Sequence, residues 1–102
     1  MRPIIISQSG VGATNWIPMD VKQAPFNVGI GCVIANSPTY NVEHTFDNVQ
    51  DSTVTPTAFI SQTGLTGNKD ANYTEPVRAI RINITSVSGS GSVTATIIQS
   101  RR

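Results

Sequence analysis

Residues 75–102 read EPVRAIRINITSVSGSGSVTATIIQSRR, and this stretch decides the fold class. Isoleucines alternate with polar residues from Ile80 to Thr85, which is the period of a strand with one apolar and one polar face. The Ser/Gly run at 88–92 interrupts the pattern, and alternation resumes from Val93 to Ile97. The stretch therefore predicts two strands joined as a β-hairpin. Its apolar face must pack on another layer.

Residue composition extends this prediction to the whole chain of 102 residues. The sequence holds twelve Ile, ten Val and twelve Thr but a single Leu. β-Branched side chains suit pleated sheets, whereas Leu is the residue that helix cores favour. The length is that of one domain, large enough to bury a core without metal ions or disulfides. We therefore expect a single all-β domain over residues 1–102.

The first residues predict strands at the margin of a sheet. Residues 1–9 are expected to be an extended N-terminal arm or an edge strand. Ile4, Ile5 and Ile6 cannot all face one way on a strand, so either both faces are covered or the segment packs against another subunit. Pro18 confines the next short strand, 14–19, to an edge or a strand end.

A second hairpin is predicted from Phe26 to Asp47, with its turn at 36–38. Alternation places Phe26, Tyr40 and Phe46 in the core, whereas Gly29 and Gly31 occupy the opposite face, where another backbone or a ring can approach closely. Residues 57–61 predict a short strand and 64–74 an exposed loop. About six to eight short strands indicate an antiparallel β-sandwich, for which a jelly roll is one topology.

Charge and cysteine content narrow the functional classes. The net charge is +1 and 13% of residues are charged, which gives no field for gathering nucleic acid or anionic membrane. No signal peptide or transmembrane segment is recognisable, so we expect synthesis in a cytoplasm. Cys32, the single cysteine, lies in an apolar run and is predicted to be a buried, inert thiol.

Catalysis and cofactor binding are not expected. His44 is the only histidine, and its neighbour Glu43 points to the opposite face of the predicted strand. We interpret Asp47, Asn48 and Asp51 as turn residues that bond their own backbone, not as Ca²⁺ ligands. The sequence thus predicts no enzyme, no metal and no cofactor. An oligonucleotide-binding barrel is a less favoured alternative, because such barrels place aromatic residues beside a basic stripe that this chain lacks.

Several segments together resemble the small structural proteins of tailed bacteriophages. The resemblance covers roughly residues 16–99, and its clearest parts are residues 42–51 (VEHTFDNVQD), Asn72-Tyr73, 76–85 (PVRAIRINIT) and 91–99 (GSVTATIIQ). It implies a non-enzymatic protein of the virion, assembled in the host cytoplasm. The specific class implied is a capsid decoration (cement) protein, or another head or tail accessory.

The same resemblance implies partners. Decoration proteins are often jelly rolls or related sandwiches that form dimers or trimers, so the expected partners are further copies of the chain and the major capsid protein or another virion protein. Nucleic acid and membrane are not expected partners.

Side chains that one sheet face cannot bury, or that lie on a polar face, indicate where contacts with a partner are expected. Trp16 is interpreted first as an anchor in the core or at a sheet edge, with a binding contact as the alternative. The candidates are apolar residues of the N-terminal segment, two aromatic residues and the polar face of the 80–85 strand: Ile4, Ile5, Ile6, Trp16, Tyr73, Arg81, Asn83 and Thr85. The alternative function is a receptor- or carbohydrate-binding module of a tail or fibre. In that case Trp16, Tyr73 and loop Asn and Asp residues would line a saccharide site.

Overall fold

A computed structural model describes residues 4–19, 27–74, 76–87 and 89–99 of the chain. These residues form nine strands and no helix, so no helix able to cross a membrane is found among them. The strands are β1 (Ile4–Ser9), β2 (Gly12–Ala13), β3 (Ile17–Pro18), β4 (Val28–Ala35), β5 (Thr39–Thr45), β6 (Phe59–Leu65), β7 (Lys69–Tyr73), β8 (Ala79–Ser86) and β9 (Ser92–Gln99).

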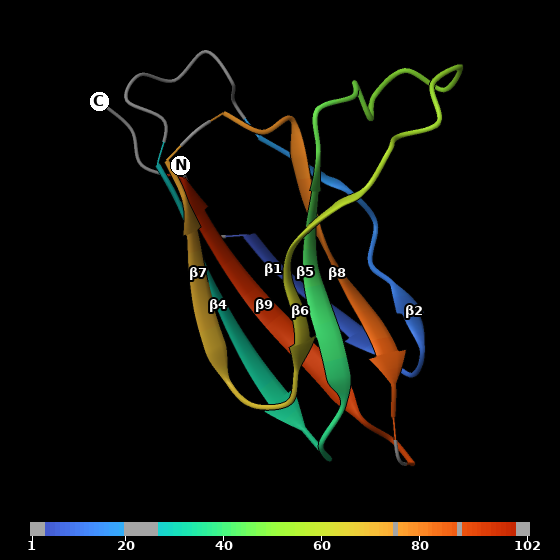
Figure 1. Cartoon of the computed structure of the whole chain (residues 1–102), viewed down its shortest axis with the longest axis vertical. Coiled ribbons are helices and arrows are strands. Elements are labelled where there is room, and N and C mark those ends of the chain that lie inside the picture. The colour runs from blue at the N-terminus through green and yellow to red at the C-terminus, as the bar shows by residue number, and fades with distance from the viewer. Residues whose placement is uncertain (1–3, 20–26, 75, 88, 100–102) are drawn as a thin grey trace.

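The strands form two antiparallel sheets that face each other (Figure 1). Sheet A has the order β1-β9-β4-β7, and sheet B has the order β2-β8-β5-β6, with β3 also paired to β8. The predicted all-β antiparallel sandwich is therefore confirmed. The described strands outnumber the prediction because β2 and β3 are two-residue pieces of one sheet edge. Pro18 lies on that edge, as its missing N–H requires.

Both predicted hairpins are wrong in their pairing. β8 belongs to sheet B and β9 to sheet A, and β4 and β5 are divided in the same way. Each connection crosses the sandwich through residues with positive φ, namely Gly89 (75°) in one and Asn36 (60°) and Ser37 (55°) in the other. Alternation shows which face of a strand is apolar, but two apolar faces can lie side by side in one sheet or meet across two sheets. Here they meet across two sheets.

The core fills the space between the sheets with aliphatic side chains. Sheet B contributes the isoleucines of β8 at 80, 82 and 84, together with Tyr40 and Val42 of β5. Sheet A contributes alternate residues of β4 and β9, including Cys32, which is a buried free thiol. Each fully buried Ile or Val stabilises the fold by about 1.5–3 kcal/mol. The Tyr40 hydroxyl donates a hydrogen bond of 2.8 Å to the Gly67 carbonyl.

The structure differs from the sequence predictions at two further places. Phe46 was assigned to the core but is 55% exposed, because β5 ends at Thr45 and the alternation stops with it. Residues 64–74 were expected to be a loop, but they contain the end of β6 and all of β7; their polar residues lie at the exposed edges of the sheets, so no apolar alternation marks them. Phe26 lies outside the described residues.

The connection between β5 and β6 is held by its own polar side chains. Asp47 accepts a hydrogen bond from the Thr57 amide (2.7 Å), and Asp51 accepts one from the Thr53 amide (2.9 Å). Asn48 accepts one from the Gln50 amide (3.1 Å). These bonds match the predicted role of turn residues. They set the path on which the chain enters β6.

Candidate functional site

The predicted contact residues of the N-terminal segment divide between the two faces of β1. Ile4 and Ile6 pack against the core, whereas Ile5 is 68% exposed. β1 pairs with β9 and forms one edge of sheet A. Intramolecular packing thus partly buries Ile4 and Ile6, whereas Ile5 points outward and is the most accessible of the three.

Ile5 lies on the outer face of sheet A, where exposed aliphatic residues are interspersed with threonines and other polar residues. Ile98 and Val33 are also exposed there, at 49% and 58%. Ile98 is paired with Gly29, and the next residue pair on this face sets Gly31 beside Thr96. A Cβ atom added at either glycine would have no atom within 4 Å other than those of the glycine and its two chain neighbours. The two glycines therefore leave open space on this face, between Ile98 and Asn72 at one position and between Thr96 and Asp70 at the next.

Three other predicted residues converge on the outer face of sheet B around Glu43. The Arg81 Nε donates to Glu43 Oε1 at 2.8 Å, and the Asn83 amide donates to Oε2 at 2.9 Å. The guanidinium of Arg81 lies 4.3 Å from the centroid of the Trp16 ring. Glu43 is 3% exposed, so its charge is compensated within the fold. Arg81 and Asn83 therefore compensate the buried charge of Glu43, and Trp16 packs against Arg81.

Thr85 lies further along the same strand. It is exposed, and its hydroxyl donates to the Thr39 carbonyl at 3.3 Å.

Tyr73 and Trp16 belong to opposite edges of the sandwich, since β7 forms one edge and β2 and β3 form the other; β7 and β2 are labelled in Figure 1. Trp16 precedes β3 beside β8, whereas Tyr73 ends β7, which is the outermost strand of sheet A. The structure therefore does not bring these two residues into one saccharide site.

Tyr73 instead joins a cluster that the sequence analysis missed. We call His44, Phe46, Phe59 and Tyr73 the aromatic cluster. The ring of His44 lies 5.3 Å from Phe46, 5.8 Å from Phe59 and 5.3 Å from Tyr73, and the two Phe rings are 5.4 Å apart. These distances are those of favourable aromatic pairs.

Pairing between β5 and β6 explains how the aromatic cluster forms. His44 is opposite Phe59, and the register shifts at two points along the pair. One irregularity involves the Gly64 amide, which donates to the side chain of Asn41 at 2.9 Å. Bulges of this kind re-aim side chains at a sheet edge. The alternation of the sequence predicts that the His44 side chain lies on the apolar face of its strand. Nothing in the sequence predicts the bulges that bring β6 beside it.

Polar atoms of the cluster form a compact hydrogen-bonded group. His44 Nδ1 lies 2.6 Å from Ser61 Oγ and 3.3 Å from the Tyr73 hydroxyl, and Ser61 Oγ also bonds the Tyr73 hydroxyl. Burial lowers the pKa of His44 below its ordinary value of 6.5. Burial raises the pKa of Tyr73, against a smaller opposing effect of the Ser61 bond. Both side chains are therefore uncharged at neutral pH.

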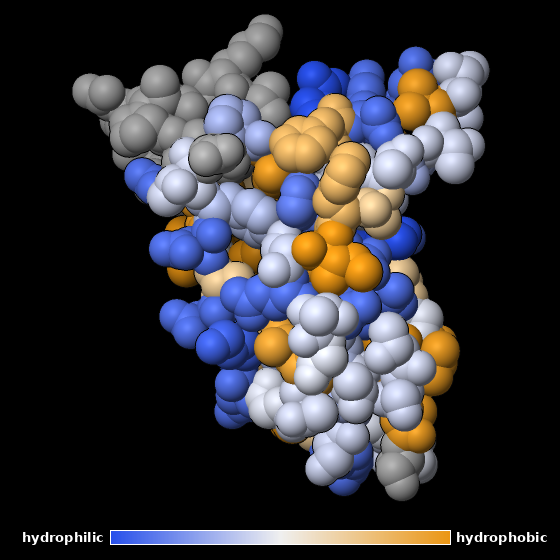
Figure 2. All heavy atoms as spheres, viewed as in Figure 1, coloured by the Kyte–Doolittle hydropathy of each residue, from blue (hydrophilic) through white to orange (hydrophobic). Residues whose placement is uncertain are grey.

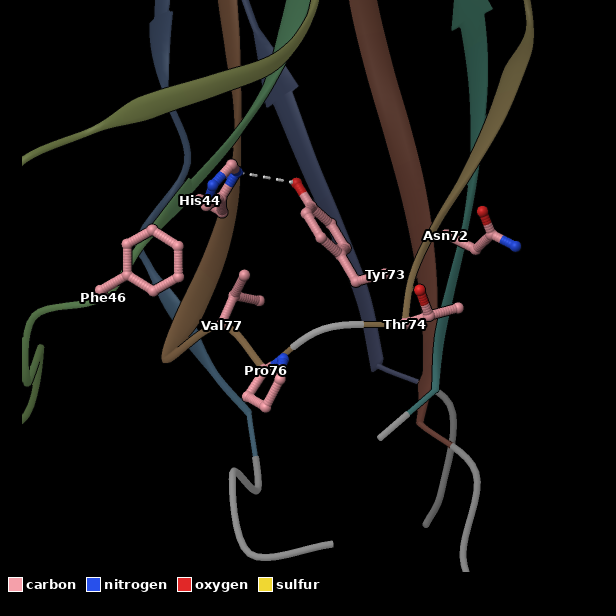
Figure 3. Close-up of a pocket in the computed structure, with 7 residues that line it drawn as sticks. All are labelled: His44, Phe46, Asn72, Tyr73, Thr74, Pro76 and Val77. Carbon is pink, nitrogen blue, oxygen red and sulfur yellow. Dashed lines mark hydrogen bonds between the residues drawn. The ribbon is translucent and has the colours of Figure 1, made fainter. Parts of the chain in front are cut away.

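An open pocket of about 280 Å³ lies beside this group. Its walls come from the end of β5, the end of β7 and the segment before β8 (Figure 3): His44, Phe46, Asn72, Tyr73, Thr74, Pro76 and Val77. In Figure 3 the Tyr73 hydroxyl points toward His44, whereas the Asn72 side chain points away from the other residues. Figure 2 shows apolar side chains gathered over the neighbouring part of β6. Phe46, Phe59 and Ile60 are 55%, 47% and 54% exposed.

The pocket has no arrangement for acid–base chemistry in the part of the chain that the structure describes. There His44 bonds hydroxyl groups and no carboxylate. The same residues contain no group of three or more His, Cys, Asp or Glu side chains that could hold a metal ion. What the pocket offers is aromatic surface beside neutral hydroxyl groups.

Comparisons with known proteins address the fold. The sequence matches no family model and no curated protein. Among solved structures, the SPBc2 prophage-derived protein YomS is similar over 98% of this chain and 96% of its own, with 14% identity and a TM-score of 0.51.

Two other solved structures score lower. A chain of Bacillus endospore appendages, described as disulfide-linked pili, matches over 99% of this chain and 87% of its own, with 12% identity and a TM-score of 0.47. A chain from the capsid of Helicobacter pylori bacteriophage KHP30 matches over 98% and 94%, with 11% identity and a TM-score of 0.37. The likeness to YomS concerns the fold alone, and we draw no conclusion from the other two.

Proposed function

We propose that this chain is a non-enzymatic structural protein of a bacteriophage virion, and specifically a decoration protein that self-associates and binds the head surface. The observation that carries the proposal is the outer face of sheet A, where Ile5, Val33 and Ile98 are all about half exposed or more. Such grouped aliphatic side chains are typical of a surface that another protein covers.

The topology supports a role in an assembly. We assign the orders β1-β9-β4-β7 and β2-β8-β5-β6 to an eight-stranded jelly roll, in which the short β2 and β3 together take one strand position. Jelly rolls recur in viral capsid domains, although one fold serves many functions. The protein of similar fold, YomS, is prophage-derived, which agrees with a phage origin.

The low charge is also consistent with a repeated contact surface. With a net charge of +1 and 13% charged residues, neighbouring copies repel each other little. Burial of the outer face of sheet A stabilises a contact by roughly 25 cal/mol per Å², before the loss of translational and rotational freedom is subtracted.

Light scattering coupled to size exclusion tests self-association, and mixing with undecorated phage heads tests the partner. We expect the wild-type protein to form a dimer or trimer and to sediment with the heads. Ile98→Glu places a charge on the outer face of sheet A beside the exposed aliphatic residues and is expected to abolish both. Val11→Glu is the matched control, because Val11 is 65% exposed but lies in the turn between β1 and β2.

Two outcomes contradict the proposal. A protein that stays monomeric at high concentration and does not bind heads is not a decoration protein. Equal loss of head binding in Ile98→Glu and Val11→Glu refutes the assignment of the contact to sheet A. Ile5→Glu tests the part of this surface that β1 supplies and leaves Ile4 and Ile6 in place; unchanged assembly of this variant would exclude Ile5 from the contact.

A further inference from the structure

The aromatic cluster is not required by the core of the sandwich. Among the described residues, Tyr40 is the only Phe, Trp or Tyr that is fully buried, and the remaining core is aliphatic apart from Met19 and Cys32. Phe46 and Phe59 instead present about half of their surface to solvent. Exposed aromatic faces are costly in water and are typical of binding surfaces.

Neutral hydrogen-bonding groups accompany these rings. The hydroxyls of Ser61 and Tyr73 and the imidazole of His44 form one bonded group, of which His44 and Tyr73 line the pocket and Ser61 lies beside it. Hydroxyls donate and accept, and a neutral imidazole does both through its two nitrogens. None of the described lining residues carries a full charge, since the lowered pKa of His44 keeps its ring neutral at pH 7. A phosphate or carboxylate ligand would therefore meet no cation among the described residues that line the pocket.

The ligand class follows from this combination. A pyranose ring has an apolar C–H face that stacks on aromatic rings and a rim of hydroxyls that both donate and accept. The pocket volume of about 280 Å³ lies at the small end of ligand sites, which suits one sugar ring. An adjoining unit of a chain would then lie over Phe59 of β6, whose ring is 5.4 Å from that of Phe46 and extends the aromatic surface beyond the pocket.

We propose that the pocket between the ends of β5 and β7 binds one ring of a neutral saccharide, with Phe46 and Tyr73 as stacking surfaces and the Ser61–His44–Tyr73 group as hydroxyl partner. The site differs from the one expected from the sequence, because Tyr73 acts with Phe46 and His44 and not with Trp16. It goes beyond the proposed structural role and does not depend on it.

Amide chemical shifts of the ¹⁵N-labelled protein test the proposal, with neutral methyl hexopyranosides and N-acetylglucosamine as probes. We expect saturable shifts confined to residues around His44, Phe46 and Tyr73, with a Kd of about 1 mM or weaker for a single ring. Glucuronic acid and p-cresol are the comparison probes. The neutral sugars are expected to bind more tightly than glucuronic acid.

Variants assign the binding to the pocket. Phe46→Ala is expected to raise the Kd about tenfold, because one well-placed aromatic contact is worth that much. Phe59→Ala tests the extension over β6 with an oligosaccharide in the same way. Ile5→Ala is the matched control, an exposed apolar residue on sheet A, and is expected to leave the Kd unchanged. Thermal unfolding of each variant verifies that it is folded.

Three results would overturn the saccharide assignment. The first is no saturable shift with any neutral sugar, and the second is a Kd that Phe46→Ala leaves unchanged. The third is binding of p-cresol alone, which would make the cluster a contact for an aromatic side chain of a protein. The decoration role is judged independently, since Phe46→Ala should still bind heads and Ile98→Glu should still bind the sugar.

Discussion

At the scale of single residues, the carboxylate of Glu43 depends most on its partners, because it is a charged group that the fold buries. It is 3% exposed and bonded to both Arg81 and Asn83. Removing one partner of a buried pair leaves a charge without compensation, which typically costs 3–5 kcal/mol. We expect Arg81→Met to lower the free energy of unfolding by about 3 kcal/mol, toward the low end because Arg81 keeps 25% of its side chain exposed. Urea denaturation measures this change.

Two further variants separate the contribution of charge from the contribution of packing to the free energy of unfolding. Glu43→Gln combined with Arg81→Met removes both charges, and we expect it to recover part of the loss. Arg78→Met is a matched control, because Arg78 is exposed and should change stability by no more than about 0.5 kcal/mol. A cost for Arg81→Met as small as that of Arg78→Met would show that the ion pair contributes nothing.

His44 gives the fold a dependence on pH. Burial lowers its pKa in the folded state below the ordinary 6.5. The unfolded chain therefore binds the proton more readily, and stability falls as pH decreases from above 6.5 toward the folded-state pKa. We expect the free energy of unfolding to be lower near about pH 5 than near about pH 7.5, and His44→Gln to reduce that difference. An identical pH profile in His44→Gln would contradict the assignment.

Residue-level prediction from the sequence succeeded where alternation was regular and failed where it ended. Ile80, Ile82 and Ile84 are buried as expected, because they lie within one uninterrupted strand. Phe46 has the right parity for the core but follows the last residue of β5. Hydropathy alone does not distinguish an apolar residue within a strand from one just beyond its end, since the position of the strand end depends on backbone pairing.

At the scale of elements, most of the strands were predictable but their partners were not. The apolar faces of β8 and β9 were both recognised, yet the strands lie in opposite sheets. The Ser/Gly run between them suits a crossing connection as well as a tight turn, because its residues tolerate positive φ. The contact that decides between the two lies far away in sequence: β5 pairs with β8, and β4 pairs with β9.

Neighbouring isoleucines of β1 test whether its side chains alternate between the core and solvent as the structure describes. Ile6 packs against the core, whereas its neighbour Ile5 is 68% exposed. We expect Ile6→Ala to destabilise the monomer by about 2 kcal/mol and Ile5→Ala to change stability by less than about 0.5 kcal/mol. Chemical denaturation at low protein concentration measures both. Equal effects of the two substitutions would mean that β1 does not have the described orientation.

At the scale of the whole molecule, the sandwich was predictable and the pocket was not. The pocket takes residues from β5, β7 and the segment before β8, and its polar group also needs Ser61 of β6. These four segments meet only because β6 and β7 are the outermost strands of facing sheets. No spacing within the sequence encodes that meeting, whereas each strand encodes its own apolar face.

Cys32 reports on the integrity of this whole arrangement. It is 3% exposed on β4, which is flanked by β9 and β7, and burial raises its pKa to about 11, against a weaker opposing effect of Tyr40. A thiol reagent attacks the thiolate, so the folded protein should be labelled only when it opens.

We expect the labelling rate at slightly alkaline pH to rise with urea with the same dependence as global unfolding, because opening β4 requires separating the two sheets. Ile30→Val, a substitution in the core beside Cys32, should accelerate labelling in proportion to its loss of stability. A rate that does not depend on urea would instead reveal local release of the β7 edge, and would mean that sheet A does not unfold as one unit with sheet B.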